Sequence, residues 1–282
     1  MRDFSRRALL GWAIACAAVA FALGLSARTL LLEDTSLSPC KQEKTATEQT
    51  APVSDRTEEP AARPKQTPAQ TRIEELPPAP AQGTSEPLVT LLVCTSFPCS
   101  ACSKAARESR PLIDSLKDRV RMEVRHSAPG IHEQARRSAV AALAAHRQER
   151  FFYMYYAMFG GQDRLTESGL RQHARRVGLN LEQFDSDMQD PALERQVAME
   201  TSLCRALGAI GTPAFFINGE RHVGWSRLAD FERVLRRHLE AAEDKLAAGV
   251  PREEIPERLA RKYATDPDNY IALVLKHISL SP

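Results

Sequence analysis

Two cysteines separated by two residues are the part of this sequence best suited to chemistry. Cys99 and Cys102 lie in the stretch 97–102, which reads FPCSAC. A thiolate is a strong nucleophile, and a second thiol nearby can resolve the mixed disulfide that the first one forms. The spacing alone is also compatible with a static disulfide or with half of a zinc site. The surrounding elements must decide among these three chemistries.

The pair lies between a predicted strand and a predicted helix. Residues 88–94 form a short apolar run with two valines, as in a buried strand, and helical spacing begins at Ser103. Cys99 then falls at a helix N-terminus, where free N–H groups and the helix dipole lower a thiol pKa from ~8.5 to roughly 3.5–7.5. We therefore predict that Cys99 is the exposed nucleophile and that Cys102 is the resolving thiol.

The remaining elements follow in the order strand, helical block, hairpin, helix. Apolar and charged residues alternate over 120–125, which predicts a half-buried strand. A helix between this strand and the first implies a parallel pair with a right-handed crossover. The helical stretch from about 131 to 207 is too long for a simple connector, so we expect an inserted subdomain. Residues 228–239 have the spacing of an amphipathic helix.

The hairpin is preceded by an unusual proline. Residues 214–217 form an apolar strand, and Asn218-Gly219 is the preferred two-residue turn. Pro213 comes directly before this strand, although proline cannot donate to a sheet ladder. A cis Thr212–Pro213 bond would explain its place, while a trans bond is the default for most X–Pro pairs.

With these residues in view, the chain resembles the DsbA family of thioredoxin-fold disulfide oxidoreductases over roughly 88–239. The matching segments are 97–102, 124–126, 151–159, 178–184 and, most specifically, 207–219. The resemblance implies an α/β thioredoxin fold with an inserted helical subdomain. It also implies that Thr212 and Pro213 form a cis-proline loop that contacts the substrate chain beside Cys99. No bound cofactor or metal is expected, because the cysteine pair itself carries two electrons.

The residues between the two cysteines depart from the family pattern. Ser100-Ala101 stands where Pro-His or Pro-Tyr is common. These residues help to set the stability of the thiolate, and ~30 mV of reduction potential corresponds to ~1.4 kcal/mol. The resemblance therefore predicts disulfide exchange but leaves open whether the protein is an oxidant, a reductase or an isomerase.

Other interpretations of the cysteines remain open. The spacing Cys94-x4-Cys99-x2-Cys102 with a distant Cys204 matches a plant-type iron–sulfur pattern. Cys94 and Cys204 are otherwise two buried apolar residues or a second disulfide. A non-catalytic binding module on the same fold is a further alternative. His126 could approach the site, although a solvated loop position is its simpler interpretation.

The N-terminus predicts export. Three arginines precede residues 8–25, which carry no charge. This pattern is typical of a membrane anchor or a cleaved signal, and Arg6-Arg7 weakly resembles a twin-arginine signal. We expect an uncleaved anchor that holds the remainder on the periplasmic side of the inner membrane. A lipoprotein role for Cys16 is only weakly supported.

Composition suggests four segments in this chain of 282 residues: an anchor or signal over 1–32, a disordered linker over 33–87, a DsbA-like domain over 88–245, and a helical extension over 246–282. The linker holds nine of the 18 prolines and also Cys40, which is either an exposed thiol or an intermolecular disulfide partner. A net charge of +2 argues against a nucleic-acid partner. We expect cysteine-containing exported proteins as substrates, and a redox partner in the membrane or periplasm.

Overall fold

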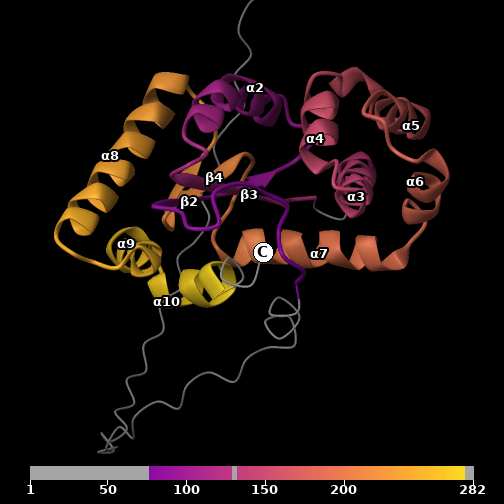
Figure 1. Cartoon of the computed structure of the whole chain (residues 1–282). Helices are drawn as coiled ribbons and strands as arrows, with labels where there is room; N and C mark the ends of the chain where they lie inside the picture. Colours follow the sequence, from indigo (N-terminus) through magenta and orange to yellow (C-terminus); the bar gives the residue numbers. More distant parts are fainter. Residues whose placement is uncertain (1–75, 129–131, 277–282) are drawn as a thin grey trace, which may run out of the picture. The chain divides into compact units, whose positions relative to one another are not determined.

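A computed structural model of the chain describes residues 76–128 and 132–276 (Figure 1). The predicted anchor over 1–32, Cys16, Cys40, most of the predicted linker and the last six residues lie outside these ranges. In the described ranges, no helix combines the length and the apolar character that a membrane crossing requires.

A five-stranded sheet forms the centre, in the order β1-β3-β2-β4-β5. The strands are β1 (Ala81–Gly83), β2 (Val89–Thr95), β3 (Val120–His126), β4 (Ala214–Ile217) and β5 (Glu220–Val223). Strands β2 and β3 are parallel and are joined through α2 (Ser100–Ser115), whereas the other neighbours are antiparallel. The predicted parallel pair and the thioredoxin-like α/β fold are therefore confirmed.

Strand β1 corrects the predicted linker at its C-terminal end. Ala81 pairs with Glu123 of β3, and the backbone oxygen of Pro80 accepts a hydrogen bond from Val124 N. Leu76 is buried against the second face of the sheet. Proline-rich composition predicted disorder up to residue 87, but prolines are tolerated beside an edge strand, where a missing donor breaks no central ladder.

Both faces of the sheet are covered. Leu91 and Val93 pack in the core cluster that includes α2, while Leu92 and Cys94 pack in the cluster beneath the opposite face. All seven residues of β3 are buried, so the prediction of a half-buried strand is wrong. Its charged residues are neutralised inside, for example by a 3.0 Å ion pair between Arg121 and Glu123.

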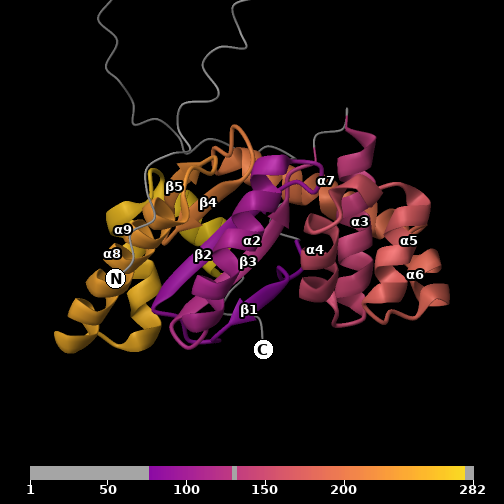
Figure 2. The same cartoon turned by 90° about the horizontal axis from the view of Figure 1, so that it is seen from above.

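Five α-helices lie between β3 and β4, where the sequence predicts a helical insertion. They are α3 (Glu133–Arg147), α4 (Phe151–Phe159), α5 (Glu167–Arg176), α6 (Leu181–Asp187) and α7 (Pro191–Ala206), with the short 3-10 turn η1 (Gln162–Arg164) after α4. Helices α3 to α6 gather at one end of the sheet, and α7 returns beneath it (Figures 1 and 2). Asp190 caps α7 by accepting a hydrogen bond from Ala192 N.

The β4–β5 hairpin turns at Asn218 and Gly219, which have φ values of 46° and 83°. These positive angles are what the predicted two-residue turn requires. The elements after the hairpin are α8 (Leu228–Ala247), η2 (Arg252–Glu254), α9 (Ile255–Tyr263), α10 (Pro267–Tyr270) and the π-helical turn η3 (Ile271–Leu275). The hydroxyl of Tyr270 lies 3.2 Å from that of Thr90 in β2, so this C-terminal part packs directly onto the sheet.

Candidate active site

Cys99 is the N-cap of α2, as the sequence predicts. Its backbone is extended, with φ −79° and ψ 118°, and its Sγ accepts a hydrogen bond from Cys102 N at 3.3 Å. Cys99 is partly exposed, whereas Cys102, on the first turn of the helix, is only 1% exposed. The two sulfurs therefore occupy different environments although they belong to one turn.

The predicted proline loop lies against this cysteine. The Thr212–Pro213 peptide bond is cis. The thiol of Cys99 donates a hydrogen bond to the backbone oxygen of Thr212 at 3.4 Å, across 113 residues of sequence. The structure thus brings together all four residues that the sequence singled out for the site.

The environment separates the acidities of the two thiols. Burial raises the pKa of Cys99, but hydrogen bonds with the side chains of Cys102 and Thr212 and with the backbone N–H groups of Cys102 and Ala101 outweigh it and lower the pKa below its usual value. Burial raises the pKa of Cys102 to about 12, even though the side chain of Thr95 acts in the opposite direction. Cys99 is consequently the thiol that ionises first, which suits a nucleophile.

Three further residues support the pair and were not found from the sequence. The side chain of Thr95 hydrogen-bonds both Cys102 and Tyr155, and Tyr155 is buried. Thr95, Cys102 and Tyr155 are among the residues that line a cavity of about 10 Å³. Gln162 in η1 donates to the backbone oxygens of Phe97 at 2.6 Å and of Cys99 at 2.9 Å. No local pattern marks these residues, because their roles depend on contacts between distant elements.

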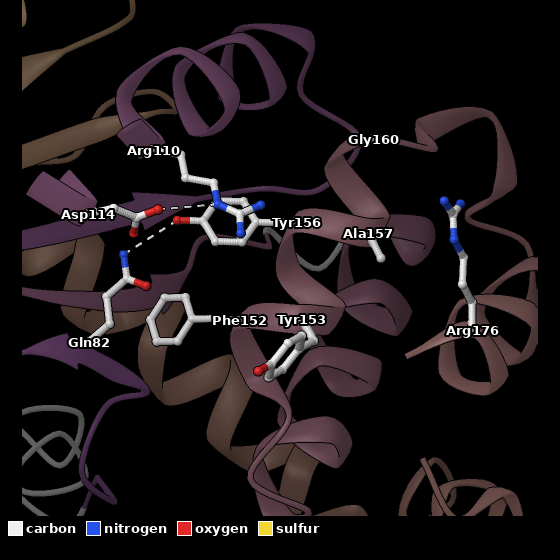
Figure 3. Close-up of a pocket in the computed structure, with 9 residues that line it drawn as sticks. All are labelled: Gln82, Arg110, Asp114, Phe152, Tyr153, Tyr156, Ala157, Gly160 and Arg176. Carbon is white, nitrogen blue, oxygen red and sulfur yellow. Dashed lines mark hydrogen bonds and ion pairs between the residues drawn. The ribbon is translucent and has the colours of Figure 1, made fainter. Parts of the chain in front are cut away.

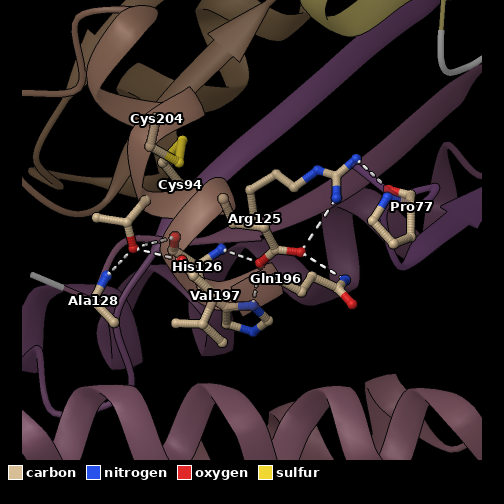
Figure 4. Close-up of polar contacts among 10 residues, drawn as sticks. Pro77, Cys94, Arg125, His126, Ala128, Gln196, Val197 and Cys204 are labelled. Atoms are coloured by element: carbon tan, nitrogen blue, oxygen red, sulfur yellow. Dashed lines mark hydrogen bonds and ion pairs between the residues drawn. A yellow bond between two sulfur atoms is a disulfide. The ribbon is translucent and has the colours of Figure 1, made fainter. Parts of the chain in front are cut away.

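A buried charge cluster lies at the end of β3 (Figure 4). Glu200 of α7 is fully buried and accepts from the backbone N of His126, and its Oε2 is 2.6 Å from His126 Nδ1. Arg125 and Gln196 also donate to this carboxylate. Burial alone would raise the pKa of Glu200, but the interactions with His126 and Arg125 lower it to about 2. His126 is therefore not a solvated loop residue, because a buried carboxylate and the insertion enclose it.

Cys94 and Cys204 form a disulfide, with a Cα–Cα distance of 5.9 Å. Both residues are fully buried, and the bond joins the end of β2 to the end of α7 (Figure 4). Of the two alternatives for these cysteines, the second disulfide is the one observed. The iron–sulfur hypothesis is wrong, because it requires both residues as free thiolates.

Cys99 opens into a groove of about 850 Å³. Its lining includes Ser96 and Pro98 before α2, residues 132–135 at the start of α3, and Arg205, Ile210 and Thr212 from the end of α7 and the loop after it. The groove gives an extended chain access to the sulfur beside the cis proline.

A second pocket of about 530 Å³ lies between α2 and α4 (Figure 3). Tyr156 forms part of its wall, with the Arg110 guanidinium 4.2 Å from the ring centroid and Gln82 Nε2 donating to the Tyr156 hydroxyl at 3.4 Å. Neither Cys99 nor Cys102 lines this pocket. We therefore place the candidate chemistry in the groove at Cys99.

Comparison with known proteins agrees with this architecture. Residues 104–236 match the family described as DSBA-like thioredoxin domain. This part of the chain is similar to a DsbA-like thioredoxin domain. The matched range includes Thr212 and Pro213, but it begins just after Cys102. The assignment of Cys99 and Cys102 as the reactive pair therefore depends on the geometry of the site.

The chain is also similar to several known proteins. A thioredoxin-like oxidoreductase from Silicibacter pomeroyi has 29% identity and a TM-score of 0.53, over 60% of this chain and 96% of that one. A periplasmic thioredoxin-like protein from Salmonella enterica serovar Typhimurium has 20% identity and a TM-score of 0.51, over 63% of this chain and 99% of that one, and shows the fold alone. Na(+)/H(+) antiporter NhaA 3 of Salinispora tropica is 31% identical over 144 residues, which is 51% of this chain. The chain spans only 22% of that antiporter's length.

Proposed function

We propose that this chain catalyses thiol–disulfide exchange through Cys99 and Cys102. The observation that carries the proposal is the asymmetry of the pair. Cys99 is reachable from the groove, lies at a helix N-terminus and has a lowered pKa, whereas Cys102 is buried and has a raised one. A nucleophile that ionises early and a resolving thiol that stays protonated until needed are what a two-step exchange requires.

In the oxidising direction the pair begins as a disulfide. A substrate thiolate attacks the Sγ of Cys99, the Cys99–Cys102 bond breaks, and Cys102 leaves as a thiolate that takes up a proton. A second substrate thiolate then attacks the substrate sulfur of the mixed disulfide, and Cys99 leaves as a thiolate. The substrate loses two electrons, and the cysteine pair gains them.

Thr212 and Pro213 are proposed to hold the substrate chain during this reaction. The backbone oxygen of Thr212 accepts a hydrogen bond from the Cys99 thiol, and Pro213 directly precedes β4. An extended substrate segment in the groove would lie along this loop, which would position its cysteine at Cys99.

The lowered pKa of Cys99 favours the oxidising direction. Stabilising the Cys99 thiolate lowers the free energy of the reduced pair, and a stable reduced form makes the disulfide a stronger oxidant. A reductase or isomerase would use the same residues in the opposite direction. The equilibrium with glutathione buffers distinguishes these functions, and a potential below about −250 mV would refute the oxidant proposal.

We further propose that the protein works outside the cytoplasm on exported proteins and exchanges electrons with a partner in the membrane or periplasm. Three basic residues before the uncharged stretch 8–25 support export and an inner-membrane anchor. The buried Cys94–Cys204 disulfide fits an oxidising compartment. Fractionation of cells that express the full chain, before and after alkaline extraction, tests location and anchoring together.

The catalytic roles are tested by two matched substitutions. Cys99→Ser should abolish exchange with a model substrate. Cys102→Ser should allow attack but block resolution, so that mixed disulfides on Cys99 accumulate on non-reducing gels. Exchange by the Cys99→Ser variant, or the absence of trapped complexes with Cys102→Ser, would contradict the role assignment.

A further inference from the structure

The groove at Cys99 contains a positive charge that the exchange reaction itself does not use. Three ionisable side chains besides the thiol line the groove, namely those of His132, Glu133 and Arg205. Arg205 is exposed on the last turn of α7. Within the described ranges, its guanidinium makes no hydrogen bond or ion pair. Among the described residues, Arg205 is thus an unpaired arginine that lines the same groove as Cys99.

The acidic residue of the groove is already engaged. Glu133 accepts hydrogen bonds from Arg136 Nε at 3.0 Å and from its Nη2. Arg136 also pairs with Glu194, so its own charge is offset within the same small network. Glu133 is therefore engaged by Arg136, and among the described residues Arg205 has no ion pair that would offset its charge toward an incoming chain.

The apolar part of the groove lies beside this charge. Ile210 is 88% exposed, and it precedes Thr212 of the cis-proline loop by two residues. A β-branched apolar side chain this exposed gains free energy when a bound chain covers it. Ile210 and Arg205 both come from the segment that ends α7 and leads to Pro213, so one bound segment can contact both.

We propose that the groove selects substrate segments that carry an acidic side chain near the reactive cysteine, with Arg205 as the residue that determines this preference. The acidic group pairs with the Arg205 guanidinium while an apolar neighbour covers Ile210. The inference rests on the proposed exchange function and adds its substrate class. The preference acts on encounter and binding, because the pair remains solvent-exposed and is screened by salt.

The test uses two peptides that are identical except for Glu or Lys two residues from their single cysteine. Oxidised protein is mixed with excess reduced peptide at low ionic strength. The peptide thiolate attacks Cys99, Cys102 leaves and takes up a proton, and rapid alkylation with mass spectrometry gives the second-order rate constant. We expect the Glu peptide to react about fivefold faster, and the ratio to approach one in about 1 M salt.

Charge reversal provides the decisive comparison. Arg205→Glu should invert the ratio in favour of the Lys peptide. Arg195→Glu is the matched control, because Arg195 is exposed on the same helix but does not line the groove. This control should keep the wild-type ratio. Comparing ratios between variants cancels the effect of Glu or Lys on the acidity of the peptide's own cysteine.

Substitution of Ile210 distinguishes the contribution of apolar contact area to peptide binding from the contribution of charge. Ile210→Ser should slow both peptides alike and leave their ratio unchanged. An unchanged ratio in Arg205→Glu, or an equal inversion in Arg195→Glu, would overturn the inference while exchange itself continues. Absence of exchange with every peptide would instead refute the proposed function on which the inference rests.

Discussion

Two cysteine pairs lie close together in this domain and have opposite environments. Cys94 and Cys99 are five residues apart in the sequence. Cys94 ends its strand under the cover of α7 and is bonded to Cys204, whereas Cys99 begins α2 with its sulfur partly exposed. Residue type alone therefore does not assign a thiol to a structural or a chemical role. Burial and the hydrogen-bond donors around the sulfur make that assignment.

The disulfide between Cys94 and Cys204 belongs to a larger set of contacts, called the clamp below, through which α7 is held to the sheet. Glu200, Thr201 and Cys204 project from the same side of this helix toward the ends of β2 and β3. Thr201 Oγ1 accepts a hydrogen bond from Ala128 N at 3.0 Å. This clamp holds the helix that precedes the cis-proline loop against the strand that precedes Cys99. The buried pair thereby supports the reactive one without taking part in its chemistry.

The largest expected difference between the pairs is their accessibility to reagents. Under mild reduction, iodoacetamide should modify Cys99 while Cys94 and Cys204 remain disulfide-bonded, with rates that differ by orders of magnitude, because reaching the buried bond requires local or global unfolding. The lowered pKa of Cys99 means that its modification should stay fast as the pH falls below 9. Peptide mapping by mass spectrometry measures both rates. Rapid modification of Cys94 in the folded protein would remove the distinction.

Removal of the buried disulfide tests its structural role. The bond links residues separated by 110 positions, so replacing both cysteines with alanine should lower the free energy of unfolding by about 4 kcal/mol. Exchange at Cys99 should persist below the lowered melting temperature. Urea denaturation measures the loss. The control replaces both Cys99 and Cys102 with alanine. Because a disulfide between these two residues closes a far shorter loop, its removal should cost less stability, while exchange is abolished.

Glu200→Gln tests the ionic part of the clamp. The pKa of Glu200 is about 2 in the fold against a usual value of 4.5, so its charge contributes stability that is fully present above about pH 4.5 and is lost as the pH falls toward 2. The substitution should cost about 3 kcal/mol at pH 7, and this difference should shrink between pH 4.5 and pH 2. Denaturation curves at several pH values measure it. The exposed Glu257→Gln should change stability little at any pH, and an equal effect there would contradict the assignment.

The smallest predicted effect concerns the resolving thiol. Thr95→Val removes the hydroxyl that bonds Cys102, so the pKa of Cys102 should rise further and resolution of the mixed disulfide should slow about fivefold, equivalent to ~1 kcal/mol. Quenched-flow trapping of the mixed disulfide measures this step. Ser109→Ala is the control. The hydroxyl of Ser109 is buried on the same helix as Cys102, but it donates to the backbone oxygen of Ala105 and not to Cys102. A similar slowing in the control would show that packing, and not the hydrogen bond, is responsible.

Features with local causes could be predicted from the order of the residues. Spacing, turn chemistry and hydrophobic periodicity predict the strand-to-helix position of Cys99, the Asn218-Gly219 turn and the helical insertion. They also place Pro213 directly before β4, whereas its cis bond is implied only by the family resemblance. These patterns act within a few residues, so they can be recognised without knowing what lies on the other side of the molecule.

Contacts between distant groups could be known only from the folded chain. Strand β1 is too short to have a period and exists because β3 offers it an unpaired edge. The way α7 crosses the sheet determines that Cys94 pairs with Cys204 and that Glu200 buries His126. It also places at the groove the guanidinium of Arg205, which has no partner in the part of the chain that the structure describes. Whether these side chains are paired, desolvated or exposed depends on contacts between segments about 75 to 110 residues apart. That contact is why the same chain holds one cysteine pair inert and leaves the other poised for exchange.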